Sequence, residues 1–334
     1  MVRQNQSPEP PPIWSRWWFK AAISVAVLVF LLRRVERHEL QMALLEADPT
    51  WVGVALCTYL LSMVVSCARW TLLARPLGFR QPLSHFFGSY FTGMYMNLFG
   101  VSTVAGDIGR ALMLAGGPGR RALALTTVLA DRGLGFVVLV WIGAAAIILQ
   151  PEYRLPLPLY YAAWLVPPAS VLAWLYGPQL MVRLLPPENR YRRMVEVDLQ
   201  PYFADARLLL GTSLVAVLFH GLQIVSQVFL GWGLGLHVPW TYYFIFVPVV
   251  NIAGMLPITF SGIGIREAGY IFFLRRVGAD RHAAMALGLL ASAIVLASGL
   301  AGGIVYLLWS GRTQEAGETM ESAGDPGKRS SAGM

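Results

Sequence analysis

The sequence predicts an all-α, polytopic membrane protein with about six full spans and two broken segments. Hydrophobic residues make up 56% of the 334 residues and only 13% are charged, which is typical of membrane proteins. Several apolar runs are long enough to cross a bilayer as helices. No large polar block remains that could fold as a separate soluble domain, so one transmembrane domain is expected over residues 17–309.

The two ends of the chain differ in composition from this domain. Residues 1–16 are polar and rich in proline, and residues 310–334 are rich in Gly, Ser and Glu, so both are predicted to be disordered tails. The first apolar run could be a signal peptide, but Arg33 and Arg34 follow it in place of a small-residue cleavage site, which favours a retained anchor. The predicted spans are residues 17–32, 51–73, 121–149, 159–177, 208–234 and 281–309.

Two further apolar stretches, 85–105 and 240–277, are interrupted by glycines and polar residues. Lipid offers no hydrogen bonds to an open backbone, so such a break must be buried in protein or line a wet cavity. The spans before and after the two breaks, and Asn97 and Asn251 within them, are separated by nearly equal lengths of chain. This spacing predicts two repeat halves, at about 51–149 and 208–309.

The basic residues favour one of two topologies for these halves. If both broken segments are re-entrant, most Lys and Arg residues fall on one side of the membrane. If each segment crosses once, giving eight simple spans, the Arg-rich loop 178–207 moves to the other side. The positive-inside rule therefore favours re-entrant segments and an inverted repeat, an architecture typical of transporters.

Charged residues inside apolar stretches cost roughly 2.5–3.5 kcal/mol each on insertion scales. Asp107 and Arg110 have the i, i+3 spacing of one helical face, for which a helix cap with a surface ion pair explains the pattern equally well. Asp131 and Arg132 lie roughly 15 Å into a predicted helix. Adjacent side chains diverge by about 100°, so each is expected to find a partner on another segment. A substrate pathway is favoured here over a structural ion pair.

The second break carries two glycines, Gly262 and Gly264, followed by Arg266 and Glu267. The glycines would let a head group approach the backbone, and arginine suits phosphate. A surface turn between two spans is the alternative. The predicted substrate-binding residues are thus Asp107, Arg110, Asp131, Arg132, Gly262, Gly264, Arg266 and Glu267.

The remaining polar residues of the apolar runs indicate structural roles. His220, Gln223 and Gln227 share one helical face, where interhelical hydrogen bonds are favoured over a ligand role. Cys57 and Cys67 fall on different faces of one helix, so neither a disulfide nor a metal site is expected. No cofactor is predicted.

The three charged motifs, taken in order, resemble those of the lysylphosphatidylglycerol synthase transmembrane, or flippase-like, family of integral membrane proteins. The family pattern is Gly-Asp…Arg, then Asp-Arg/Lys, then Pro…Gly-x-Gly-x-Arg-Glu. It is matched by Gly106 to Arg110, by Asp131-Arg132 and by Pro257 to Glu267. The resemblance covers about residues 17–309 and extends to the flippase part of the multiple peptide resistance factors.

This resemblance implies movement of a lipid head group between leaflets of the inner or plasma membrane. The lipid could be an anionic phospholipid, a glycolipid or a hopanoid-type lipid. The soluble aminoacyl-transferase domain of the resistance factors is absent from the sequence, so lipid lysylation is not expected. No ATP-binding loop is present, so transport is expected to be passive or ion-coupled, with arginines neutralising a phosphate and carboxylates holding the arginines or titrating with a coupled proton.

Two other functions fit the sequence. A membrane-embedded lipid-modifying enzyme, such as a glycosyltransferase, could use Glu46 and Asp48, although Asp48-Pro49 is more typical of a helix start. A non-catalytic partner of a lipid-synthesis complex is the other. Membrane lipid as substrate and lipid-biosynthesis enzymes are the expected partners, and an oligomer is compatible with the sequence. The net charge of +8 is attributed to cytoplasmic loops and anionic lipid rather than to nucleic acid.

Overall fold

The computed structural model describes residues 37–99, 104–186, 188–189, 192, 194–255 and 264–324. All regular structure in these ranges is helical, which confirms the predicted all-α class. The predicted first span and Gly262 lie outside the described residues.

The described α-helices are α2 (Arg37–Leu45), α3 (Pro49–Ala74), α4 (Leu83–Phe99), α5 (Val104–Ala115), α6 (Arg121–Leu149), α7 (Leu157–Leu184), α9 (Gln200–Ala204), α10 (Ala206–Gly233), α11 (Trp240–Met255), α12 (Ile265–Leu274) and α13 (Arg281–Gly324). Short 3-10 turns follow or precede them at Arg75–Leu77, Pro118–Arg120, Pro151–Tyr153 and Arg275–Val277, and a π-helical turn spans Met194–Asp198.

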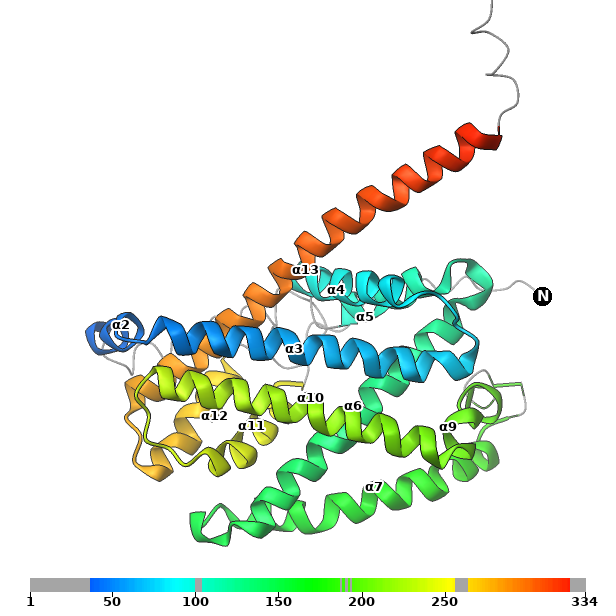
Figure 1. Cartoon of the computed structure of the whole chain (residues 1–334). Helices are drawn as coiled ribbons and strands as arrows, with labels where there is room; N and C mark the ends of the chain where they lie inside the picture. Colours follow the sequence, from blue (N-terminus) through cyan, green and yellow to red (C-terminus); the bar gives the residue numbers. More distant parts are fainter. Residues whose placement is uncertain are drawn as a thin grey trace, which may run out of the picture.

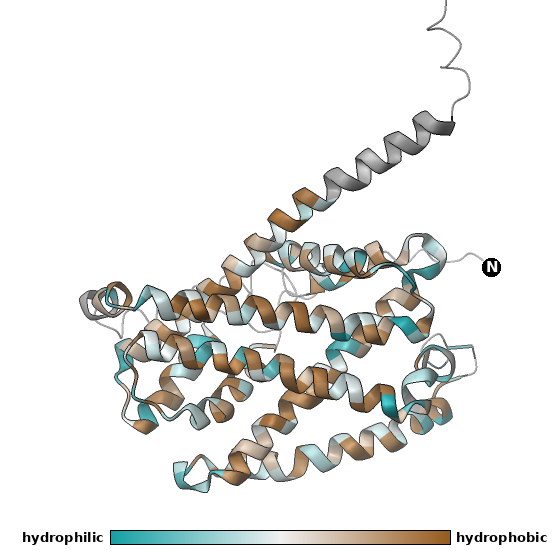
Figure 2. Ribbon diagram, in the orientation of Figure 1, coloured by the Kyte–Doolittle hydropathy of each residue, from teal (hydrophilic) through white to brown (hydrophobic). Residues whose placement is uncertain are grey.

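Five of the described helices are long and apolar enough to cross a membrane: α3, α6, α7, α10 and the part of α13 up to Trp309. They coincide with the five predicted spans that lie within the described residues, so the chain is a multi-pass membrane protein. Figure 2 shows hydrophobic residues along the middle of α3 and α10 and hydrophilic residues toward the two ends of the bundle.

The helices extend further than the sequence patterns indicated. Helix α2 lies between the predicted spans 17–32 and 51–73, and α7 continues past residue 177 to Leu184. The bounds of helix α13 run past residue 309, the predicted end of the last span, to Gly324. Ala, Glu, Gln and Met in this extension are good helix formers, which explains how the helix can continue without an apolar run.

The two long helices α3 and α10 lie side by side and antiparallel (Figure 1). At one end the backbone N–H of Asp48 donates to the carbonyl oxygen of Gly233 at 2.8 Å. Further along, the Ser226 hydroxyl donates to the carbonyl oxygen of Ala55 at 2.7 Å. These bonds fix the register of one long helix against the other.

The shorter helices form two pairs on opposite sides of α3 and α10. In Figure 1, α4 and α5 lie above these two helices and right of centre, whereas α11 and α12 lie below them and to the left. The packing is reciprocal: α4 packs on α13 as α11 packs on α6, and α6 contacts α10 as α13 contacts α3.

Glycines allow the first short pair to pack closely. A Cβ on Gly106 would lie 2.0 Å from the carbonyl oxygen of Gly93, so α4 and α5 meet backbone to backbone. The Gly106 N–H, at the start of α5, donates to Asn97 Oδ1 at 2.8 Å. Helix α13 approaches α4 in the same manner, since a Cβ on Gly302 would lie 2.4 Å from the Phe91 carbonyl oxygen. The small residues of the last span therefore allow close helix packing.

Candidate functional site

A cavity of about 330 Å³ is lined by residues from α3, α4, α5, α6, α10, α11, α12 and α13. Both pairs of short helices thus contribute to one cavity, together with the long helices between them. Its wall is rich in polar groups for a bundle of apolar helices. The polar and charged lining residues include Arg69, Arg110, Asp131, Arg132, His220, Gln223, Gln227, Asn251 and Arg266.

Asp131 of α6 lies at the centre of the charged groups and is almost fully buried. Its Oδ1 accepts a hydrogen bond from Arg69 Nε of α3 at 2.8 Å, and its Oδ2 accepts one from Arg110 Nη2 of α5 at 3.1 Å. The side chains of both arginines are 4% exposed. One carboxylate therefore joins three helices, and each of its oxygens binds a different guanidinium group.

Arg132, which follows Asp131 on α6, pairs with Asp107 of α5. Arg132 donates from Nε to Asp107 Oδ2 at 2.8 Å and from Nη2 to Asp107 Oδ1 at 3.0 Å. Arg110 also contacts Asp107 Oδ1, at 3.1 Å from its Nη2. The Arg132 side chain is 45% exposed, unlike the other two arginines. These contacts confirm that Asp131 and Arg132 each find a partner on another segment, and that Asp107 and Arg110 share a helical face.

Aromatic rings hold the buried guanidinium groups in place. Arg110 lies over Trp70 and Tyr90, with its guanidinium carbon 4.8 and 5.1 Å from the ring centres. Arg69 lies over Phe219 at 5.1 Å. Such cation–π contacts stabilise a positive charge that has left water. The aromatic contacts therefore help to fix the orientation of both guanidinium groups.

Two nitrogen atoms in this cluster are buried and make no hydrogen bond within the described residues: Nη1 of Arg69 and Nη1 of Arg110. Buried polar groups in proteins are nearly always paired, so an unpaired donor on a charged side chain calls for an explanation. Arg69, Arg110 and Arg132 carry three positive charges against the two negative charges of Asp107 and Asp131. The cluster thus holds one net positive charge beside a cavity.

A second polar group lies at the start of α12. The Glu267 carboxylate is fully buried. It accepts a hydrogen bond from the Gly264 N–H at 2.6 Å and another from the Ser292 hydroxyl at 2.8 Å. Arg266 donates from Nη1 to the same hydroxyl at 3.2 Å. Gly264 has a φ of +90°, which favours glycine, so this residue shapes the turn into α12.

The predicted site residues therefore form two groups around one cavity. Asp107, Arg110, Asp131 and Arg132 form the charged cluster, and Gly264, Arg266 and Glu267 belong to the start of α12. Among the described residues no ion pair joins the two groups. Gly262 lies outside the described residues.

The sequence analysis did not single out Arg69, which lies near the end of the predicted span 51–73. Helix α3 continues to Ala74, so Arg69 lies more than one turn inside it and is buried. The signal available was a charge within an apolar run, one turn after Ser66. An arginine near the end of a span usually reaches the interface, which is why this signal favoured the wrong location.

His220 and Gln227 make hydrogen bonds to other helices. A ring nitrogen of His220, Nε2, lies 2.9 Å from the Gly135 carbonyl oxygen, and the Tyr270 hydroxyl donates to Gln227 Oε1 at 3.3 Å. Both are interhelical hydrogen bonds, as predicted. Asp48 caps α3 by accepting from the Thr50 N–H at 2.8 Å, which confirms the helix start. In the described ranges no group of three or more His, Cys, Asp or Glu side chains could hold a metal ion.

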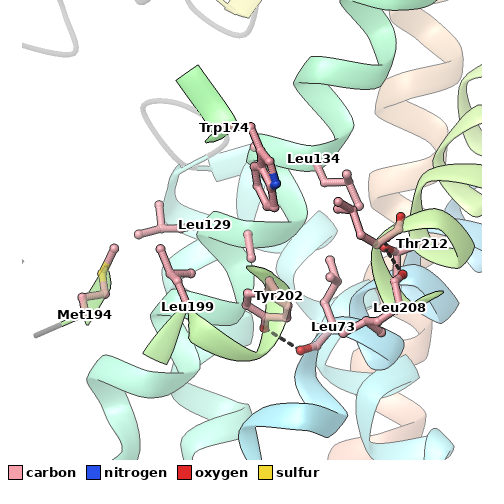
Figure 3. A pocket seen from close by; sticks show the side chains of 12 residues that line it. Leu73, Leu129, Leu134, Trp174, Met194, Leu199, Tyr202, Leu208 and Thr212 are labelled. Carbon is pink, nitrogen blue, oxygen red and sulfur yellow. Dashed lines mark hydrogen bonds between the residues drawn. The ribbon is translucent and has the colours of Figure 1, made fainter. Parts of the chain in front are cut away.

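A second cavity, of about 210 Å³, lies where α3, α6, α7 and α10 meet the π-helical turn and α9 (Figure 3). Its wall is apolar, with Leu73, Leu134 and Trp174 among its side chains. The Tyr202 hydroxyl in this wall donates to the Leu73 carbonyl oxygen, and the Thr212 hydroxyl donates to a carbonyl of its own helix. This cavity offers no charged group, so the larger one is the candidate for a polar ligand.

Comparison with known families gives one match. The family described as "Lysylphosphatidylglycerol synthase TM region" matches residues 17–303. No curated protein and no solved structure matches the chain. The matched range includes every described residue of the charged cluster and of the start of α12.

Proposed function

Because the chain belongs to the family of the lysylphosphatidylglycerol synthase transmembrane region, we propose that it is an integral membrane lipid translocator rather than an enzyme. It would move the head group of an anionic phospholipid, a glycolipid or a hopanoid-type lipid between leaflets of the inner or plasma membrane. The observation that carries the proposal is the buried charged cluster of Arg69, Arg110 and Asp131 beside a cavity among apolar helices.

The energetic cost of this arrangement supports a role in transport. Charged groups at membrane depth are expensive and typically mark the path of a polar substrate. A purely structural interior could use apolar side chains at lower cost, because buried ion pairs seldom improve stability over well-packed apolar residues. A lipid head group needs a polar environment on its way through the hydrocarbon layer, and this cavity would supply one.

Two features support the inverted repeat and the re-entrant segments. At 1.5 Å per residue, α5, α11 and α12 are about 18, 24 and 15 Å long, shorter than a hydrocarbon core of roughly 30 Å. The reciprocal packing of α4 on α13 and of α11 on α6 is what a two-fold relation between the halves 51–149 and 208–309 would produce. Discontinuous helices around a central substrate site are characteristic of transporters with such repeats.

The carboxylates would position the arginines, Asp107 and Asp131 directly and Glu267 through Ser292. The enzyme alternative relied on Glu46 and Asp48 as an acidic site. Asp48 is engaged as the cap of α3, so this alternative ranks lower. Lipid-biosynthesis enzymes remain the proposed source of the substrate.

Lipid movement in proteoliposomes tests the proposal. Purified protein would be reconstituted with fluorescent phospholipid or glycolipid, and access of a membrane-impermeant quencher to the inner leaflet would be followed over time. The wild type is expected to accelerate movement of one lipid class above the rate of empty vesicles. Arg266→Ala should remove the acceleration, whereas Arg276→Ala, in the turn after α12, should leave it intact. A wild-type rate equal to that of empty vesicles for every class would reject the function.

A further inference from the structure

We propose that Arg69 and Arg110 together bind one phosphate group, with Asp131 as the residue that positions both. This inference deepens the proposed function, on which it relies for a lipid as the source of the phosphate. It also adds Arg69, which the sequence analysis did not single out, and places Arg132 outside the phosphate site.

Both buried arginines have more hydrogen-bond donors than partners. A guanidinium group has five N–H donors on three nitrogens and cannot lose its charge in a protein. Arg69 uses Nε on Asp131 and directs Nη2 toward the Ser66 hydroxyl at 3.5 Å. Arg110 uses Nε and Nη2 on Asp107 and Asp131. In both, Nη1 is buried and has no partner in the described part of the chain.

Arg132 differs from the two buried arginines in its partner and in its exposure. Its Nε and Nη2 bind the two oxygens of Asp107 in a bidentate pair, and its side chain is half exposed. Arg132 is therefore neutralised by a carboxylate and can satisfy its other donors elsewhere. The unmet donors belong to the two fully buried arginines, where an unmade hydrogen bond is most costly.

The positions and the charge of Arg69 and Arg110 suit a phosphate group. Because the two oxygens of Asp131 bind one guanidinium each, Arg69 and Arg110 flank the same carboxylate and line the same cavity. Arginine forks match the oxygens of phosphate and form charge-assisted hydrogen bonds with them. The cluster holds one net positive charge, and a phosphodiester carries one negative charge, so a single phosphodiester would make the cluster neutral.

Aromatic rings contact both buried arginines and hold their guanidinium groups in place. Trp70 and Tyr90 hold the guanidinium of Arg110, and Phe219 holds that of Arg69. A ligand therefore meets donors that are already oriented and loses little affinity to ordering them. The test must leave these contacts and the Asp131 ion pair in place.

Native mass spectrometry of the full chain in detergent provides the test. The probes are phosphatidylglycerol, diacylglycerol with the same acyl chains, and inorganic phosphate. The wild type is expected to bind phosphatidylglycerol at least about tenfold more tightly than diacylglycerol, the effect of losing one charged hydrogen bond. Inorganic phosphate should compete with phosphatidylglycerol if phosphate itself is recognised. Equal binding of the two lipids would overturn the proposal.

The variants locate the site. Arg69→Lys keeps a charge for Asp131 but lacks the planar fork, so phosphatidylglycerol affinity should fall about tenfold while the unfolding midpoint stays within a few degrees. Arg276→Lys is the matched control outside the cavity. A larger loss in Arg132→Lys than in Arg69→Lys would overturn the assignment of the two arginines.

The two proposals can fail separately. If Arg69→Lys transports lipid at the wild-type rate and binds phosphatidylglycerol as tightly, the phosphate site is wrong and the translocator is unaffected. If the wild type binds phosphatidylglycerol selectively through Arg69 but moves no lipid, the site is supported and the translocator is wrong. If inorganic phosphate binds through Arg69 and phosphatidylglycerol does not, the site holds free phosphate and the lipid source is rejected.

Discussion

Replacing Asp131 by Asn is expected to destabilise the protein strongly. The substitution keeps the size of the side chain and removes its charge, so packing is preserved and the electrostatic effect is isolated. Arg69 and Arg110 would then lose the only carboxylate that they share, and both are buried. The net charge of the cluster would rise by one.

The structure sets the size of the effect. Removing one partner of a buried ion pair typically costs about 3–5 kcal/mol, because the remaining charge stays out of water. Arg110 retains Asp107, whereas Arg69 has no second carboxylate partner among the described residues. Asp107→Asn should cost less, since Arg110 would keep Asp131 and the Arg132 side chain is 45% exposed and lines the cavity.

The measurement is the free energy of unfolding of purified protein, from denaturant titrations of both variants and the wild type in one detergent. The double variant Asp131→Asn with Arg69→Gln removes the charge that Asp131→Asn leaves uncompensated. It should therefore be less destabilised than the sum of its two single variants, by an interaction energy of about 0.5–3 kcal/mol.

Two results would refute this reasoning. Equal destabilisation by Asp131→Asn and Asp107→Asn would mean that burial does not set the strength of these pairs. Additive effects in the double variant would mean that Arg69 and Asp131 are not energetically coupled, whatever their distance.

Three further substitutions test the packing. Gly106→Ala should abolish folded expression, because the new methyl group would lie 2.0 Å from the Gly93 carbonyl oxygen; normal yield and a normal elution profile in detergent would contradict the backbone contact. Gly133→Leu should raise the unfolding midpoint, since a Cβ at Gly133 meets nothing within 4 Å and the side chain would enter the apolar cavity; helix propensity adds about 1 kcal/mol. Tyr202→Phe should lower the free energy of unfolding by about 1 kcal/mol through loss of the bond to the Leu73 carbonyl; no change would show that the bond contributes nothing.

The spans could be predicted because their signals are local. Helix α6 begins and ends at the predicted residues, since Arg121 and Pro151 bound an apolar run. The extension of α13 could not be predicted in the same way, because its residues are polar and lack a hydrophobic pattern. Whether the broken segments are re-entrant depends on their position relative to lipid, which no local pattern encodes.

The site was predictable only in part, for a related reason. An adjacent Asp and Arg deep in a span must each find a partner, and this requirement follows from the sequence alone. Which partner each one takes depends on how α3 and α5 pack on α6, so the role of Arg69 was not apparent. The contacts of Arg266 and Glu267 with Ser292 likewise depend on the packing of α12 on α13.

The hydrogen bonds between α3 and α10 have a mechanical consequence. The bonds from Asp48 to Gly233 and from Ser226 to Ala55 join these helices at one end and partway along their length. Sliding one helix past the other would break both bonds, and the buried Ser226 hydroxyl would leave its partner where lipid offers no replacement. The two helices therefore keep one register, and in a translocator a movement that opened the cavity to either leaflet would have to come from the helices packed around them.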